Sequence, residues 1–560
     1  MTPVTMDIIM DKNKIQLMGR KLNVSRLALF TCTALVAANV SAGDLKIEPR
    51  ISADTIFQQI DSDARGDRDV TTLRLVPSID AIYTAKRAKA SVDLSATHLE
   101  RDTDVFSTKN DYIEYRYDGE LDVIERLLTL GVRGSSRYRN TNTNNFLISD
   151  KLTNSADLAR VQTDTISATT DFTRNPLLET TASVSYRKVQ AEQSSFINSQ
   201  QLNNETFSAI GSIKDGQAVD GFKWNIYGNY SDTDRSEANL GTFETHEVEG
   251  FIDRLISGRW ALRLAGKSES YAFNSQGDFI QDERAFDSVG AGFTYYKADD
   301  RYISLTANKA NSSNEENDGD VFPGLDVNWA FTSRTSFSAK LSKRFYGDSA
   351  NLSIKHATRK IRTSVFYSED VRNSSQFLGI DNTEGVLVCP GAGFSPNCFQ
   401  PNSLSYELTG GQQFIQLGED NNAIDDSIVL RKAGGFEMSY QSRVLTLGLF
   451  ARYNDNEFLG QERRLKTETL GTNAAYRIGA FTRLNATLSF ADIDREEQTG
   501  VSSTGENMVF DVALNHTFSP HLNLNAGYSY TKQDGEARVG AFGNNYTEHR
   551  LQLGVTYTFR

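Results

Sequence analysis

The chain has 560 residues, of which 39% are apolar and 10% aromatic, and its formal net charge is −13. A soluble core of this size would require more apolar residues, and a disordered chain would have fewer aromatics and more proline than the 9 found here. The acidic balance argues against nucleic acid as a partner, since neutralising its phosphates needs a basic surface. An ordered fold with one apolar and one polar face fits this composition.

Residues 1–42 are predicted to be a secretory signal peptide. Basic residues precede a short apolar run, and small residues follow it: Arg20, Lys21 and Arg26, then 27–38, then Val40-Ser41-Ala42. We expect cleavage after Ala42, because the run is shorter than the roughly 20 residues of a membrane-spanning helix. Met18 is a plausible start, which would place residues 1–17 upstream of the translated protein.

From residue 43 onward, apolar and polar residues alternate with a period of two. The clearest segments are 71–83, 128–133, 222–230, 260–267, 445–453, 484–490, 510–514, 522–530 and 551–559. This period is that of a β-strand with one apolar and one polar face. The longer segments approach the roughly 9–11 residues with which a tilted strand spans a bilayer.

Short and long polar connections alternate between these segments. The short ones include 85–88, 174–177, 257–259, 297–301 and 519–521, and the long ones include 61–69, 140–155, 192–204 and 533–545. This rhythm predicts an all-β fold: one transmembrane up-and-down antiparallel β-barrel over residues 43–560, with about 24 strands and any even number from 18 to 26 acceptable. A sandwich is disfavoured because open sheets rarely exceed about 10 strands. A solenoid is disfavoured because no fixed repeat length is visible.

The first predicted strand begins almost at the cleavage site, so we expect a barrel with no plug domain. Barrels of this size are too wide for their own side chains to fill, which predicts an aqueous lumen. Two prolines, Pro49 and Pro77, fall inside predicted strands. Each lacks the N–H that a ladder hydrogen bond needs, so we expect an interrupted ladder or a bulge there.

The C-terminal strand carries a second signal. Apolar Leu551, Leu553, Val555, Tyr557 and Phe559 alternate with polar residues or glycine. The stretch resembles the C-terminal assembly signal of bacterial outer-membrane proteins at Gln552, Gly554, Tyr557 and Phe559. That resemblance implies the outer membrane as the location and the barrel assembly machinery as a partner. Arg560 departs from the pattern, since such chains usually stop on the aromatic residue.

One connection, about residues 372–425, is much longer than the others. It contains three of the nine prolines and both cysteines that follow the signal segment, Cys389 and Cys398. In an oxidising compartment we expect these two to form a disulfide. The loop either constricts the pore or decorates the outside of the barrel, and the residues favour neither.

No catalytic or metal site is predicted, and no cofactor is expected. The six histidines form no ligand cluster, and the acidic stretch 314–320 lacks the spacing of a calcium loop. We therefore expect that the chain is not an enzyme.

The polar face of the predicted strands is rich in charge. Alternation places these residues toward the lumen as possible pore-lining groups: Glu114, Arg116, Asp118, Arg133, Lys223, Arg263, Lys267 and Lys340. Charges of both signs imply a wet lumen, since unpaired charge in a dry interior is costly. The same charges can instead pair across strands and stabilise the wall.

The mature chain resembles the β-barrel porins that accompany exopolysaccharide export and exosortase-type loci. The resemblance rests on the short lead into the first strand, the strand TTLRLVPSIDAIY (71–83) and the many tight hairpins. It implies a channel for polysaccharide export or for hydrophilic solutes, in outer-membrane lipid, with periplasmic export proteins as partners. The alternative is a barrel that sheathes or anchors another protein.

Overall fold

Twenty-four antiparallel strands form one sheet in the computed structural model, and the sheet closes on itself. The structure describes residues 43–63, 66–102, 109–140, 147, 149–153, 158–173, 175–192, 202–235, 241–274, 281–313, 318–377, 386–390, 398–401, 406, 408, 412–415, 417, 427–459, 463–497, 502–535 and 545–559. The predicted signal peptide, residues 1–42, lies outside this part.

The strands follow one another around the ring in chain order. Their bounds are β1 Asp44–Ser62, β2 Arg68–Thr84, β3 Ala88–Arg101, β4 Asp111–Ile124, β5 Leu128–Asn140, β6 Leu158–Phe172, β7 Leu178–Ala191, β8 Asn203–Asp215, β9 Phe222–Asp234, β10 Thr242–Ser257, β11 Trp260–Asn274, β12 Gln281–Ala298, β13 Arg301–Ser312, β14 Val321–Thr332, β15 Thr335–Arg344, β16 Gly347–Ala357 and β17 Ile361–Asn373. After the long connection come β20 Ile428–Gln441, β21 Leu445–Phe458, β22 Arg463–Arg477, β23 Thr482–Glu496, β24 Ser502–Thr517, β25 Leu522–Gly535 and β26 Tyr546–Thr558.

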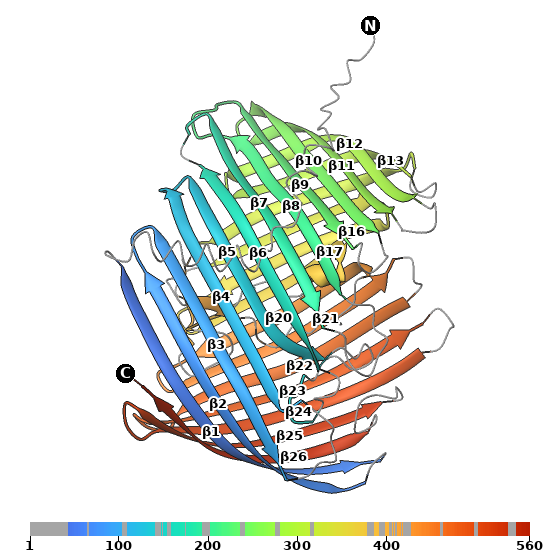
Figure 1. The fold of residues 1–560 in the computed structure, drawn as a ribbon. Helices are drawn as coiled ribbons and strands as arrows, with labels where there is room; N and C mark the ends of the chain where they lie inside the picture. Colours follow the sequence, from blue (N-terminus) through green and yellow to red (C-terminus); the bar gives the residue numbers. More distant parts are fainter. Residues whose placement is uncertain are drawn as a thin grey trace, which may run out of the picture. The chain divides into compact units, whose positions relative to one another are not determined.

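The ring closes between its first and last strands. β1 pairs with β26 in antiparallel register from Arg50↔Thr558 to Ser62↔Tyr546, and Figure 1 shows the blue β1 beside the red β26. Closure leaves no unpaired strand edge, which a sheet in lipid cannot tolerate. The prediction of an all-β antiparallel ring of about 24 strands is confirmed.

Connections at one end of the ring are uniformly short, between two and six residues. At the other end they include the connections 102–110, 141–157 and 374–427. Outer-membrane barrels have short periplasmic turns and longer extracellular loops. We therefore assign the end with the short turns to the periplasm.

An apolar belt covers the outer face of the ring. On β26, Leu551, Leu553, Val555 and Tyr557 are 36–50% exposed, and on β11 Trp260, Leu262 and Leu264 are 47–64% exposed. A soluble protein rarely exposes so much contiguous apolar surface. A barrel that stands in a membrane exposes it to the lipid tails, so the fold is that of an outer-membrane β-barrel.

Leu488 and Thr487 lie next to each other near the middle of β23, on opposite faces of the wall. Leu488 shares its face with the exposed Phe490, while Thr487 shares its face with the buried Ile493. We expect Leu488→Arg to destabilise the folded barrel by about 2–4 kcal/mol, because it places a charge in the hydrocarbon. Urea unfolding in detergent or lipid, followed by heat-modifiable gel mobility, measures this.

The matched control is Thr487→Arg, which places the same charge on the inner face. We expect it to change the unfolding free energy by less than about 1 kcal/mol. Equal effects of the two substitutions would contradict the assignment of faces.

Pro77 interrupts its ladder as the sequence predicts. The β2–β3 register runs from Thr72↔Arg101 to Leu75↔His98 and resumes at Ser78↔Ser95 without a shift. The two positions between, Val76 and Pro77, have no partner in that ladder. The strand thus accepts the proline by losing local pairing and not by forming a bulge.

The expected unplugged barrel is wrong. The connection between β17 and β20 supplies chain that lies inside the ring, where Val386, Leu387, Cys389, Cys398 and Leu417 are at most 3% exposed and pack against Phe450 of the wall. The expectation considered only the chain before the first strand. An insertion between two later strands can fill interior space even when no segment precedes the first strand.

Candidate functional site

The charged residues predicted to line a pore lie on the inner face of the wall, and most of them are paired there. Arg133 donates to Asp118 at 2.7 Å, and Glu114 accepts from Lys151 at 2.5 Å. Lys340 pairs with Glu249, and Lys223 pairs with Asp299 in a periplasmic turn. Arg116 also lies on this face, opposite Asp93 and Ser135 in the ladders of β4. The two earlier interpretations, lining a pore and stabilising the wall, therefore overlap.

Arg263 is buried in a network of side chains from β10, β11, β12 and β14. Its guanidinium donates to both carboxylate oxygens of Asp253 at 2.8 Å and to Asp326 at 3.0 Å. Asp253 is 0% exposed and also accepts from the hydroxyl of Tyr296. A bidentate pair with further hydrogen bonds is the geometry in which a buried ion pair is tolerated.

A second network lies nearer the extracellular end of the same strands. Glu269 is buried and accepts from Lys267 and Arg344, both at 2.9 Å. An apolar cluster continues inward from it and includes Phe243, Tyr271, Phe286, Phe322 and Phe345. The interior along β10–β15 is thus filled by ion pairs and aromatic side chains.

The upper part of β17 leaves the wall. β16 and β17 pair only between Leu352↔Tyr367 and Ala357↔Arg362, whereas β17 and β20 stay paired up to Asn373↔Ile428. Both faces of this upper pair carry buried apolar residues. Val371, Ile428 and Leu430 join the aromatic cluster of β10–β15, while Val429 joins Phe458, Leu465 and Ile493 on the other side.

The short helix that follows β17 reaches the opposite wall. In η3, Ser374–Phe377, the carbonyl oxygen of Gln376 accepts from Arg187 of β7 at 3.0 Å, and Ser375 accepts from Asn204 of β8 at 2.6 Å. The Gln376 amide donates to Ser231 and Thr233 of β9. β7–β9 lie far from β17 along the ring, so upper β17, η3 and the start of β20 cross the interior. We call this segment (368–377 with 428–433) the partition.

The rest of the insertion folds against the inner face of β20 and β21. Its strands β18, Leu387–Pro390, and β19, Gln412–Ile415, form a hairpin, and the predicted disulfide Cys389–Cys398 is present. Ser439 donates to the carbonyl oxygen of Val386 at 3.3 Å. The insertion therefore lies in the interior, and the alternative of an external decoration is wrong for its described residues.

Leu417 is the apolar anchor of the insertion. It is 0% exposed, and Arg452 of β21 donates two hydrogen bonds to its carbonyl oxygen, at 2.9 and 3.1 Å. A Cβ atom at Gly448 would come within 2.8 Å of the Leu417 side chain. Glycine at position 448 thus permits the close approach of the insertion to the wall.

The lower end of the insertion reaches the periplasmic turns. The backbone N–H of Gln400 donates to the side-chain oxygen of Gln441 at 2.8 Å. The side-chain amide of Gln400 donates to the carbonyl oxygen of Thr358 at 3.1 Å. Gln441 ends β20, and Thr358 lies in the turn between β16 and β17. The insertion therefore extends from the partition to the periplasmic rim.

A second connection, between β5 and β6, also turns inward. Asp150 pairs with Arg550 of β26, and Thr153 donates to Glu548 at 2.7 Å. Burial opposes the ionisation of Asp150, but the Arg550 guanidinium offsets it and holds the pKa of that carboxyl below its ordinary value. Leu152 packs with Ile56, Leu99 and Tyr112 of the wall.

The predicted assembly signal contributes to the seam of the barrel. Gln552 and Asn525 donate to the Asp54 carboxylate at 3.0 and 3.1 Å, and Arg74 donates to it at 3.0 Å. A Cβ atom at Gly554 would lie 1.9 Å from an Asp54 oxygen, so glycine makes room for this carboxylate. Tyr557 and Phe559 stay exposed, with ring centroids 4.9 Å apart. Recognition by the assembly machinery stays a prediction.

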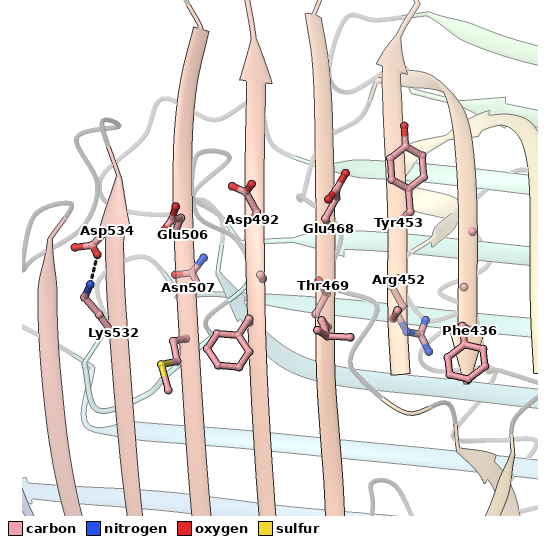
Figure 2. Close-up of a pocket in the computed structure, with 17 residues that line it drawn as sticks. Phe436, Arg452, Tyr453, Glu468, Thr469, Asp492, Glu506, Asn507, Lys532 and Asp534 are labelled. Atoms are coloured by element: carbon pink, nitrogen blue, oxygen red, sulfur yellow. Dashed lines mark ion pairs between the residues drawn. The ribbon is translucent and has the colours of Figure 1, made fainter. Parts of the chain in front are cut away.

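The outer face of β20–β25 bears a shallow cavity of about 770 Å³ (Figure 2). Phe436, Leu470, Phe490 and Met508 line its apolar part. Four carboxylates stand directly opposite one another along its other edge: Glu468, Asp492, Glu506 and Asp534. The change from apolar to acidic side chains marks the extracellular limit of the belt.

The described residues contain no group of three or more His, Cys, Asp or Glu that could hold a metal ion. Within the same part of the chain, no helix is long and apolar enough to cross a membrane. The absence of enzymatic activity stays a prediction.

No family model and no curated protein matches this chain. Among solved structures it is similar to the siderophore receptor PirA from Acinetobacter baumannii, with 10% identity over 92% of this chain and 81% of that chain and a TM-score of 0.39. The FrpB iron transporter (F3-3 variant) from Neisseria meningitidis has 10% identity over 94% and 83%, with a TM-score of 0.41. OmpT, an outer membrane protein of Vibrio cholerae, has 10% identity over 93% and 98%, with a TM-score of 0.30.

The insertion inside the ring, and not these likenesses, is the evidence against an open, unplugged barrel. At this level of similarity the comparison identifies no site residue, which leaves the interior geometry as the guide to function.

Proposed function

We propose that this chain is an outer-membrane transport channel for a hydrophilic substrate, in its narrower form a polysaccharide chain that leaves the periplasm. The observation that carries the proposal is the chemistry of the inner wall along β22–β26. There many inward side chains are amides and hydroxyls that remain partly exposed, with the charged Arg483 and Asp511 among them. The uncharged ones are Asn485, Thr487, Asn515, Asn525, Ser529 and Gln552. Such groups exchange hydrogen bonds with water and with sugar hydroxyls at little net cost.

The interior on the two sides of the partition differs, and the difference supports a substrate route on one side only. Along β10–β15 the interior is filled by the Arg263 and Glu269 networks and by the aromatic cluster. Along β20–β26 and β1–β6 it is occupied by the insertion and by segment 150–153. Hydrogen bonds, the Asp150–Arg550 ion pair and apolar contacts around Leu417 and Leu152 hold these two segments in place. Substrate passage on this second side requires only that chain segments move, and the strand ladder stays intact.

The test is single-channel conductance of the purified protein in a planar bilayer, with folding verified by heat-modifiable gel mobility. We expect discrete channel openings. Neutral dextrans short enough to enter the channel should reduce the current, and dextrans too long to enter should leave it unchanged. A variant that releases the insertion, Leu417→Asp, is measured beside it. Silence of both folded proteins would contradict a transport channel.

A further inference from the structure

Four exposed cations follow one another on three successive periplasmic turns. Arg334 lies between β14 and β15, Arg359 and Lys360 lie between β16 and β17, and Arg443 lies between β20 and β21. Backbone hydrogen bonds join these turns, from Ala357 to Arg334 and from Gln441 to Lys360, both at 2.8 Å. Within the described residues, none of the four cations forms an ion pair.

Cations at several other turns have acidic neighbours, whereas Arg259, in the turn between β10 and β11, contacts the hydroxyl of Tyr295. Lys86 and Arg87 lie 3.9 Å from Glu125, and Lys223 pairs with Asp299. Arg301 lies 3.7 Å from Asp300. The whole chain has a net charge of −13, so a run of cations without acidic neighbours is not a consequence of composition.

The cationic run continues on the inner side of the rim. Arg477 ends β22, is exposed and stands directly opposite Arg483 of β23. Arg477 shares its face with the buried Ala475 and Asn473, which point inward. We call Arg334, Arg359, Lys360, Arg443 and Arg477 the basic rim.

The basic rim lies beside the lower end of the insertion. Gln400 bonds to the carbonyl oxygen of Thr358, the residue before Arg359, and to the side chain of Gln441, two residues before Arg443. A ligand bound at the rim would therefore contact the turns that hold the insertion. An attractive field at a pore mouth also raises the local concentration of oppositely charged ligand.

We propose that the basic rim is the periplasmic docking site for an acidic linear polysaccharide, a sugar polymer that carries carboxylate, sulfate or phosphate groups. The proposal rests on the function proposed above and names its substrate class. Several cations at successive turns match a polymer with repeated negative charges better than they match a single small anion. The inward-facing Arg477 and the adjacent Gln400 favour a ligand at the mouth over lipid headgroups around the outside.

The experiment compares dextran sulfate with neutral dextran of the same length. Binding to the detergent-purified protein is measured by calorimetry, and block of the channel current is measured with polymer added to each chamber separately. We expect dextran sulfate to bind at least about tenfold more tightly than neutral dextran at low salt, and to lose this advantage near 1 M salt. Block is expected from one chamber only.

The variant R334Q/R359Q/K360Q/R443Q removes four charges from exposed turns and is expected to weaken dextran sulfate binding at least about tenfold. The matched control K86Q/R87Q removes two turn cations that lie beside Glu125 and is expected to bind like the original protein. Equal binding by the original protein and the rim variant would overturn the proposal. The proposal would also be overturned if the rim variant bound dextran sulfate like the original protein and differed from it only in stability in phosphatidylglycerol vesicles. The rim would then be a lipid contact.

The two proposals fail separately. A silent channel that still binds dextran sulfate through the basic rim would contradict transport but support the docking site. A conducting channel without preference for the acidic polymer would do the reverse.

Discussion

The Leu417→Asp variant is expected to convert a mostly closed channel into a mostly open one. Leu417 is fully buried between Gly448 and Phe450 and anchors the insertion to β21. Burying an unpaired carboxylate there costs roughly 3 kcal/mol or more, which shifts the docking equilibrium of the insertion at least about a hundredfold. Planar-bilayer recordings should show larger currents and open states that occupy most of the record.

Leu408→Asp is the matched control, because Leu408 belongs to the same insertion but is 37% exposed. Its currents are expected to match those of the unmodified protein. If Leu417→Asp leaves the conductance unchanged while the barrel remains folded, the insertion does not obstruct the route.

Replacing Arg263 with alanine is expected to lower the free energy of unfolding by about 3–5 kcal/mol. The substitution would leave the Asp253 carboxylate, which is 0% exposed, without its bidentate partner. It would also remove a hydrogen bond that Asp326 accepts. The guanidinium also packs 3.9 Å from the centre of the Phe251 ring, so the substitution removes packing as well as charge. Urea unfolding of the detergent-folded barrel measures the change.

Arg133→Ala provides the comparison, because the Arg133–Asp118 pair has a similar N–O distance, 2.7 Å against 2.8 Å, but side chains that are 47% and 31% exposed. Solvent screening limits that pair to below about 1 kcal/mol. The double variant Arg263→Met with Asp253→Leu should recover part of the stability lost in Arg263→Ala. Similar losses for Arg263→Ala and Arg133→Ala would show that burial does not decide the energetics of these pairs.

The local sequence pattern was sufficient to predict the strands and the turns. The alternation at 551–559 and at 260–267 predicted both the strands and the face that each exposes, because neighbouring side chains on a strand point to opposite sides. The short turns at 258–259 and 299–300 lie within the predicted connections 257–259 and 297–301. The disulfide Cys389–Cys398 also followed from spacing and compartment.

The contents of the interior did not follow from local pattern. Val371 and Leu430 have the alternation of lipid-facing residues, yet both are buried in the partition, because β17 leaves β16 above Tyr367. Arg263 and Arg133 occupy equivalent positions in their patterns, but Arg263 is buried and Arg133 is half exposed. Nothing in the neighbouring residues distinguishes these cases, since each depends on strands that are distant in sequence.

The sequence by itself determined the all-β class, the approximate strand number, the apolar outer face and the side on which the short turns lie. Each of these depends on contacts between neighbouring residues or neighbouring strands, which a two-residue period encodes directly. Only the tertiary structure decided that upper β17, η3 and the insertion cross the ring, and that Arg334, Arg359, Lys360 and Arg443 align on one rim. The physical reason is that closing a ring of 24 strands brings together residues whose separation along the chain carries no local signal.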